Sequence, residues 1–184
     1  INQLNADNES FNPIPDYFFY DLNGKVNYEL GEKDQLFLSG YLGRDRFAFS
    51  DDNFNFNFDW GNTNANLRWN HFFSPKLYVN TSLSYTDYEY VIANRFDEFS
   101  FELGSKITDG ALRTDFTWLP NSKHTVRFGA SGIHHRFGVG RLEASGGEED
   151  SVFNFDAGDI YYAMEWGAYI SDEIEFNDRF KLNL

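Results

Sequence analysis

The 184-residue chain contains no cysteine, so it has no disulfide framework, no thiol nucleophile and no thiolate metal site. Long apolar runs are missing as well, and mean hydropathy is −0.55. No window approaches the roughly 18 to 20 consecutive apolar residues that a helical membrane span needs. A helical membrane protein is therefore excluded. A membrane protein built from strands is not, because its strands need only every second residue to be apolar.

Basic residues are scarce. Lys and Arg number 15 against 29 Asp and Glu, and the formal net charge is −14. Because the phosphate backbone selects basic surfaces, this balance argues against a nucleic-acid partner.

Motifs for catalysis and metal binding are missing too. The sequence has no Gly-x-Ser-x-Gly elbow, no glycine-rich phosphate loop and no carboxylate pair of defined separation, so we predict no enzyme and no catalytic residue. His134 and His135 are adjacent, and neighbours in a strand face opposite sides of a sheet. The acidic residues Glu148, Glu149 and Asp150 match no defined calcium loop. We therefore predict no metal site and no cofactor.

What the sequence does have is an alternation of apolar and polar residues along nearly its whole length. In one segment, Thr63, Ala65, Leu67 and Trp69 alternate with Asn62, Asn64, Asn66, Arg68 and Asn70. Successive side chains of a strand point to opposite faces, so each such segment has one apolar and one polar face. Polar faces rich in Asn and Arg indicate a wet interior, which is typical of a large transmembrane β-barrel.

The alternation predicts about eight antiparallel strands. The expected strands are 16–30, 35–47, 58–72, 77–90, 97–119, 123–137 and 159–176, followed by a short last strand. Short turns are expected at 31–34, 73–76, 119–123 and 177–178, and long connections at 48–57, 91–96 and 138–158. Outer-membrane barrels have this asymmetry, with short periplasmic turns and long extracellular loops. Trp69 and Trp118 precede short turns, where an interfacial aromatic girdle is expected.

Residues 97–119 admit two interpretations. Phe99, Phe101 and Leu103 set an odd-numbered apolar face, whereas Leu112 and Phe116 set an even-numbered one. Two strands could turn at residues 109–110, or one strand could carry a bulge there, since one inserted residue exchanges the faces and glycine is a common bulge residue. We favour one bulged strand, because it keeps the short turns on one side of the membrane.

Several segments, rather than one motif, carry a family resemblance. They are 17–28, 38–47, 115–121, 123–129 and 168–173, together with the most specific stretch, Trp60-Gly61-Asn62-Thr63 followed by 67–71 and 73–77. In order and spacing, these segments resemble barrel strands of TonB-dependent outer-membrane receptors of the Bacteroidetes type. The resemblance covers about 16–184. It implies energised uptake of a scarce nutrient, such as an iron chelate, cobalamin, a glycan or a peptide.

In that family a barrel of twenty-two strands surrounds an N-terminal plug, which is preceded by a TonB box. We expect residues 1–184 to be one partial barrel domain of a longer protein, because the chain shows no plug domain, no TonB box and no signal peptide. The resemblance implies the cell outer membrane as location and membrane lipid and lipopolysaccharide as surroundings. It also implies TonB as a partner through the absent plug, and a surface lipoprotein or larger outer-membrane complex. The alternative is a small stand-alone barrel with a structural or binding role.

The candidate substrate-binding residues are charged and aromatic residues expected in extracellular loops. They are Arg44, Asp45, Arg46, Phe54, Phe56, Trp60, Arg95 and Arg141. Arginine beside aromatic rings suits carboxylates, or sugar rings that stack on Phe and Trp. We expect this group to face incoming substrate where the strands leave the membrane.

Overall fold

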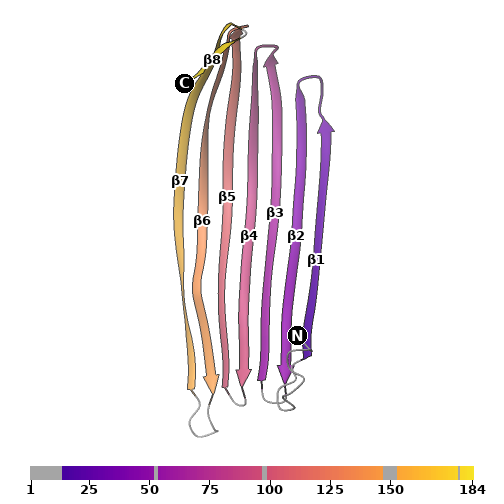
Figure 1. Cartoon of the computed structure of the whole chain (residues 1–184), viewed down its shortest axis with the longest axis vertical. Helices are drawn as coiled ribbons and strands as arrows, with labels where there is room; N and C mark the ends of the chain where they lie inside the picture. The colour runs from indigo at the N-terminus through magenta and orange to yellow at the C-terminus, as the bar shows by residue number, and fades with distance from the viewer. Residues whose placement is uncertain (1–13, 52–53, 97–98, 147–152, 178) are drawn as a thin grey trace.

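The computed structural model describes residues 14–51, 54–96, 99–146, 153–177 and 179–184. It is an all-β chain in which each strand pairs antiparallel with the next, in sequence order (Figure 1). The strands are β1 (Ile14–Glu29), β2 (Asp34–Asp51), β3 (Phe54–Ser74), β4 (Leu77–Phe96), β5 (Phe99–Asn121), β6 (His124–Gly146), β7 (Phe153–Asn177) and β8 (Phe180–Asn183). The predicted eight antiparallel strands are thus confirmed. Within the described ranges, the structure contains no helical segment of the length and apolar character that crossing a bilayer requires.

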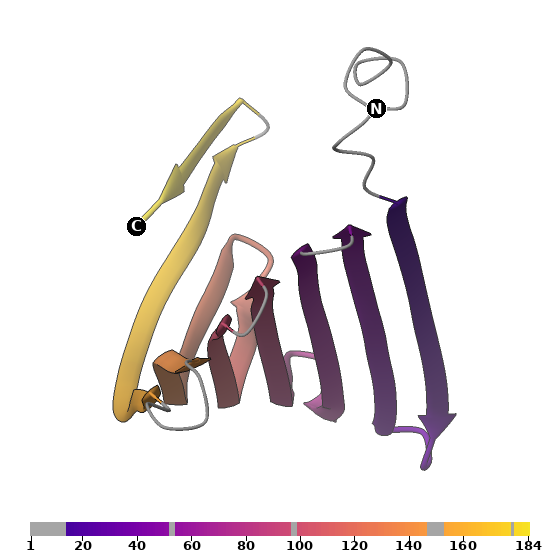
Figure 2. The same ribbon diagram turned by 90° about the horizontal axis from the view of Figure 1, so that it is seen from below.

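The sheet is open and curved. Seen end-on, it bends into an arc between β1 and β7, with a concave and a convex face (Figure 2). β1 pairs only with β2, and β8 pairs only with β7. The described strands therefore leave free edges, and the backbone groups along them need further strands before such a wall can stand in lipid.

The two ends of the sheet differ. At the turn end, β1 and β2, β3 and β4, and β5 and β6 are joined at 30–33, 75–76 and 122–123. The opposite end, which we call the rim, holds the ends of β2, β4 and β6 and the starts of β3, β5 and β7 (lower end in Figure 1). Cross-strand backbone hydrogen bonds brace the turn end, such as Phe72 N to Lys33 O at 2.9 Å.

The strands reach further toward the rim than the sequence predicted. Most of the long connections expected at 48–57, 91–96 and 138–158 belong to β2, β3, β4, β6 and β7. The reason is that the alternation continues there with a different chemistry. Phe47 pairs with Phe58 and Phe49 pairs with Phe56 across the sheet, and Asn57, between Phe56 and Phe58, faces the opposite side. Here apolar residues occupy the face that is polar in the middle of the sheet. In the sequence such a stretch resembles a loop, but in the structure it continues the strand pairing.

The apolar face of the middle of the sheet is the more exposed one. Leu67 is 42% exposed, whereas Asn66 and Arg68 on the opposite face are only partly exposed. Side chains crowd together on the inside of an arc and splay on its outside, so we assign the apolar face to the convex side. Its exposed members, here called the apolar band, are Leu22, Val26, Leu38, Leu42, Leu67, Leu83, Leu112, Met164, Trp166 and Ile170.

Residues 99–119 form one strand, as favoured, but the bulge is not where the sequence placed it. Gly110 pairs in continuous register with Tyr85 on β4 and His134 on β6. The irregularity lies nearer the rim, between Gly104 and Lys106, opposite 138–141 of β6. In that stretch Gly140 has φ 64, a left-handed conformation that glycine adopts without a Cβ penalty. The change from odd to even apolar residues along β5 needs no bulge, because Phe99, Phe101 and Leu103 lie on the concave face.

The expected aromatic girdle at the turn end has two exposed tryptophans. Trp69 and Trp118 are 37% and 45% exposed on the convex face. Trp69 Nε1 donates a hydrogen bond to Asp34 Oδ1 at 2.9 Å, and His71 Nδ1 lies 2.7 Å from the same oxygen. This gives the tryptophan an apolar ring with a polar anchor, which suits a membrane–water boundary.

Candidate functional site

The concave face changes character toward the rim. In the middle of the sheet it carries Asn64, Asn66 and Arg68 of β3 opposite Ser84 and Ser82 of β4. Closer to the rim, the same face carries a continuous surface of rings. This surface, here called the aromatic patch, consists of Tyr17, Phe19, Phe47, Phe49, Phe54, Phe56, Phe58, Trp60 and Tyr90.

Ring contacts hold the patch together. The centroids of Phe58 and Trp60 are 4.4 Å apart, those of Phe49 and Phe56 are 5.0 Å apart in a stacked arrangement, and Phe58 also meets Tyr90 edge-on. Such pairs stabilise one another beyond the area that they bury. Part of each ring still faces the concave side, since none of these residues is fully buried. A cluster of partly exposed rings on one face is a candidate binding surface.

One carboxylate lies inside the patch. Asp45 pairs with Phe19 on one side and Trp60 on the other, and Tyr90 follows in the same cross-strand row. Tyr17 Oη donates a hydrogen bond to Asp45 Oδ1 at 2.6 Å. A tyrosine phenol is protonated at neutral pH, so it donates this bond to the carboxylate.

The convex face changes in the opposite sense. Beyond the apolar band it becomes polar and charged toward the rim. Asp59 receives Arg44 Nε at 3.5 Å and Arg46 Nε at 3.8 Å. One strand further on, Lys106 Nζ lies 3.0 Å from Asp87 and 3.4 Å from Glu89. Along the same strands, therefore, the face that is apolar in the middle is ionic at the rim.

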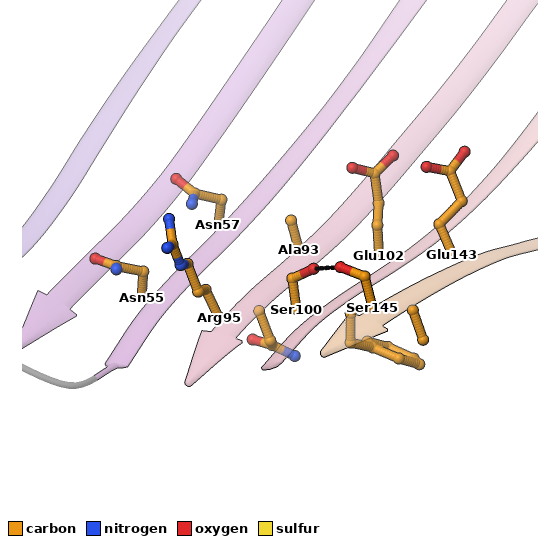
Figure 3. A pocket seen from close by; sticks show the side chains of 11 residues that line it. Asn55, Asn57, Ala93, Arg95, Ser100, Glu102, Glu143 and Ser145 are labelled. Atoms are coloured by element: carbon orange, nitrogen blue, oxygen red, sulfur yellow. Dashed lines mark hydrogen bonds between the residues drawn. The ribbon is translucent and has the colours of Figure 1, made fainter. Parts of the chain in front are cut away.

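A groove of about 570 Å³ crosses this convex face at the rim. Figure 3 shows side chains of β3, β4, β5 and β6 that line it, and the eight labelled ones lie on one side of the sheet. Those labelled are Asn55, Asn57, Ala93, Arg95, Ser100, Glu102, Glu143 and Ser145. Ser100 and Ser145 Oγ atoms are 2.6 Å apart, and Glu102 pairs directly with Glu143 across the ladder. Amides, hydroxyls, carboxylates and one guanidinium make this a surface for a polar ligand with many hydroxyl groups.

The structure divides the residues that the sequence grouped into one substrate site. Asp45, Phe54, Phe56 and Trp60 lie on the concave face, whereas Arg44, Arg46, Arg95 and Arg141 lie on the convex face. The two sets are separated by the sheet itself, so arginine and rings do not meet in one site as expected. Phe54, Phe56, Arg95 and Arg141 were expected in long connections, but they lie in strands because the alternation of faces continues to the rim.

Sequence reasoning grouped Phe47, Phe49 and Phe58 with the candidate residues but missed Tyr17, Phe19 and Tyr90 as members of the patch. A usable signal was present, because the period of two that runs through the middle of each strand continues to its rim end. Counting that period outward from Val26 places residues 17 and 19 on the face opposite to Leu22 and Val26.

Histidine and carboxylate pairs occur elsewhere on the sheet. His135 Nδ1 lies 2.7 Å from Asp109 Oδ1 on the concave face, and His124 Nδ1 lies 2.7 Å from Asp172 Oδ2 near the turn end. Among the residues that the structure describes, no group of three or more His, Cys, Asp or Glu side chains is arranged to hold a metal ion. The acidic residues 148–150 lie outside the described residues.

The comparisons with known proteins bear on the fold. No protein-family model matches the chain, and no curated protein matches its sequence. A solved structure does match, that of the ferric yersiniabactin uptake receptor FyuA from Yersinia pestis, with a TM-score of 0.68 and 12% sequence identity. The match covers 92% of this chain and 28% of that receptor, so this chain spans less than a third of the receptor's length. At this identity the likeness concerns the fold alone: the chain is an open sheet of eight antiparallel strands that matches part of a TonB-dependent receptor barrel.

Proposed function

We propose that this chain is part of the wall of an outer-membrane uptake receptor of the TonB-dependent, Bacteroidetes type. The observation that carries the proposal is the exposed apolar band on the convex face of an open sheet whose concave face is polar at the same height. A water-soluble sandwich would cover those leucines with a second sheet. A wall that stands in lipid leaves them outside and keeps its polar side toward a wet lumen.

In this proposal the rim is extracellular and the turn end is periplasmic. The aromatic patch then lines the mouth of the lumen, where a nutrient arrives, and residues outside this chain supply the rest of the barrel and its plug. The free edges of β1 and β8 favour this reading over a small stand-alone barrel, in which the first and last strands would pair.

The same orientation of the sheet defines which partners each of its surfaces would meet. TonB would act through a plug that this chain does not contain. Lipid would cover the apolar band, and the sugars and phosphates of lipopolysaccharide would lie against the convex groove with Arg95 and Asn57. A surface lipoprotein or a larger outer-membrane complex would sit at the rim. The described concave face at the rim carries rings and Asp45 but no basic side chain to pair with a phosphate backbone, so we propose no nucleic-acid partner.

Cysteine labelling of intact cells tests the orientation. Because this chain has no cysteine of its own, single substitutions give a clean background within it. In the full-length protein, Ser100→Cys at the rim should react with a membrane-impermeant maleimide, whereas Glu32→Cys at the turn end should react only after the outer membrane is opened. Equal labelling of both in intact cells, or recovery of the protein in the soluble fraction, would refute the proposal.

The TonB-driven part needs a separate measurement. The purified periplasmic domain of TonB should retain the full-length receptor from detergent extract of outer membranes. A receptor that behaves as an outer-membrane barrel in the labelling experiment but is not retained would limit the proposal to an uptake channel that does not use TonB.

A further inference from the structure

Positive and negative side chains are segregated at the rim. The Lys and Arg residues of the rim half of the described strands all lie on the convex face: Arg44, Arg46, Arg95, Lys106, Arg136 and Arg141. On the concave face the basic residues lie from the middle of the sheet toward the turn end, as Lys25 and Arg68 do. The described concave surface near the rim therefore has carboxylates without basic side chains.

Those concave carboxylates lie among rings. Asp45 stands between Phe19 and Trp60, and Asp159 accepts a hydrogen bond from Tyr161 Oη at 3.1 Å on the far side of the arc. Phe19 is 60% exposed, so its ring is open to a ligand. Opposed residues in neighbouring strands have Cβ atoms about 5 Å apart. A cation that pairs with Asp45 therefore has an aromatic neighbour on each side, which is the arrangement that cation–π attraction requires.

From this arrangement we infer that the concave rim surface binds an organic cation that carries an apolar or aromatic group. The charge of the ligand pairs with Asp45, and its apolar part lies on the ring faces of Phe19, Trp60 and Phe58. Anionic ligands are disfavoured, because the described part of this surface holds negative charge and no guanidinium or ammonium group to offset it. The inference deepens the proposed function and rests on it, because it takes the concave face as the entry of an uptake barrel.

Three probes with one ring and different charges test the inference: phenethylammonium, 2-phenylethanol and 3-phenylpropionate. Binding of each to the purified full-length receptor in detergent is measured by equilibrium dialysis. We expect the cation to bind about five- to tenfold more tightly than the neutral alcohol, and the carboxylate to bind most weakly. Equal affinities, tightest binding of the carboxylate, or binding of none of the three would overturn the inference.

A matched pair of substitutions locates the effect. Asp45→Asn removes the concave charge at nearly constant size and should abolish the preference for the cation over the alcohol. Asp59→Asn removes a carboxylate on the convex face and should leave the preference unchanged. Heat-modifiable migration in gels reports whether each variant has assembled. If Asp45→Asn does not assemble, Phe19→Leu takes its place: it removes an exposed ring beside Asp45 and should reduce the preference for the cation over the alcohol.

The inference and the proposed function fail separately. If the protein labels as an outer-membrane barrel but binds the three probes equally, the inference is wrong and the proposed function still holds. If the protein is soluble, or if Ser100→Cys and Glu32→Cys label equally in intact cells, both the proposed function and the inference are wrong.

Discussion

The middle and the rim of this sheet are formed by the same strands, but the chemistry of the two faces is exchanged between them. In the middle, Leu67 and Leu83 point to the convex side and Asn66 and Ser84 to the concave side. At the rim, the rings of the aromatic patch point to the concave side and the ion pairs of Asp59 point to the convex side. The backbone ladder runs through both regions, so the inversion is a property of the side chains alone. The difference teaches that one strand can carry opposite chemistry on the same face at two heights; under the proposed function these heights are the lipid-embedded middle and the outer mouth of the lumen.

The substitution with the largest expected effect places a charge in the apolar band. Leu67→Arg puts a guanidinium on the convex face in the middle of β3, where it should cost about 2–4 kcal/mol of stability in a bilayer. Asn66→Arg, one residue earlier, faces the concave side and should cost far less. Urea unfolding of the full-length receptor in lipid vesicles, followed by tryptophan fluorescence, measures both. Equal losses would mean that the two faces of the middle region are wrongly assigned.

The bulge in β6 keeps the rim of that strand in phase with its neighbours. Gly140→Ala should cost about 1–2 kcal/mol, because an L-residue at φ 64 brings its Cβ close to the following carbonyl. No heavy atom lies within 4 Å of the position that this Cβ would take, so the cost comes from the backbone and not from a clash. The same unfolding experiment measures it.

Gly138→Ala is the control for the bulge. Its added Cβ would meet Lys106 O at 3.7 Å, an ordinary contact, and its backbone is not left-handed. We expect little change or a slight gain in stability. A Gly138→Ala loss as large as that of Gly140→Ala would remove the backbone explanation.

The middle of the sheet could be predicted from the sequence, and the rim could not. At Leu67 and Asn66 the apolar and polar residues alternate in the phase that lipid and lumen demand, so period and composition agree. At Phe56 and Asp59 the period persists, but the chemistry of the two faces is exchanged, and a short window of Phe, Asn and Asp looks like a loop. Counting every second residue outward from the middle recovers the face of each residue in β2 and β3, but not beyond the bulge of β6.

Other features needed coordinates. The pairing of Arg44 with Asp59 depends on the register between β2 and β3, which no local pattern fixes. The choice between Gly110 and Gly140 as bulge residue depends on φ, which the sequence does not display. The arginines and the rings do not share one surface for a related reason: Asp45 and Arg46 are neighbours in the chain but face opposite sides of the sheet. Their role in substrate binding stays a prediction.

The aromatic patch can be weakened without changing its apolar character. Phe58→Leu keeps an apolar side chain but removes the ring contacts with Trp60 and Tyr90, so it should cost about 0.5–1.5 kcal/mol beyond any change in buried area. Phe96→Leu, at an exposed ring near the rim, should change stability less. Paired unfolding curves measure the difference, and a larger loss for Phe96→Leu would mean that ring contacts do not organise the patch.

The smallest expected effect sharpens the comparison most, because it concerns residues that the sequence alone placed at the substrate. Arg44→Gln combined with Arg46→Gln removes both partners of Asp59 on the convex face. Their side chains are more than half exposed, at 57% and 56%, and exposed ion pairs contribute about 0–1 kcal/mol, so stability should hardly change. Binding of phenethylammonium should not change either, since the sheet separates these arginines from Asp45 and Trp60. Equilibrium dialysis of the double variant, beside Asp45→Asn, measures this binding. A loss of binding in the double variant would show that the convex side takes part in ligand recognition and that the two faces of the rim do not act independently.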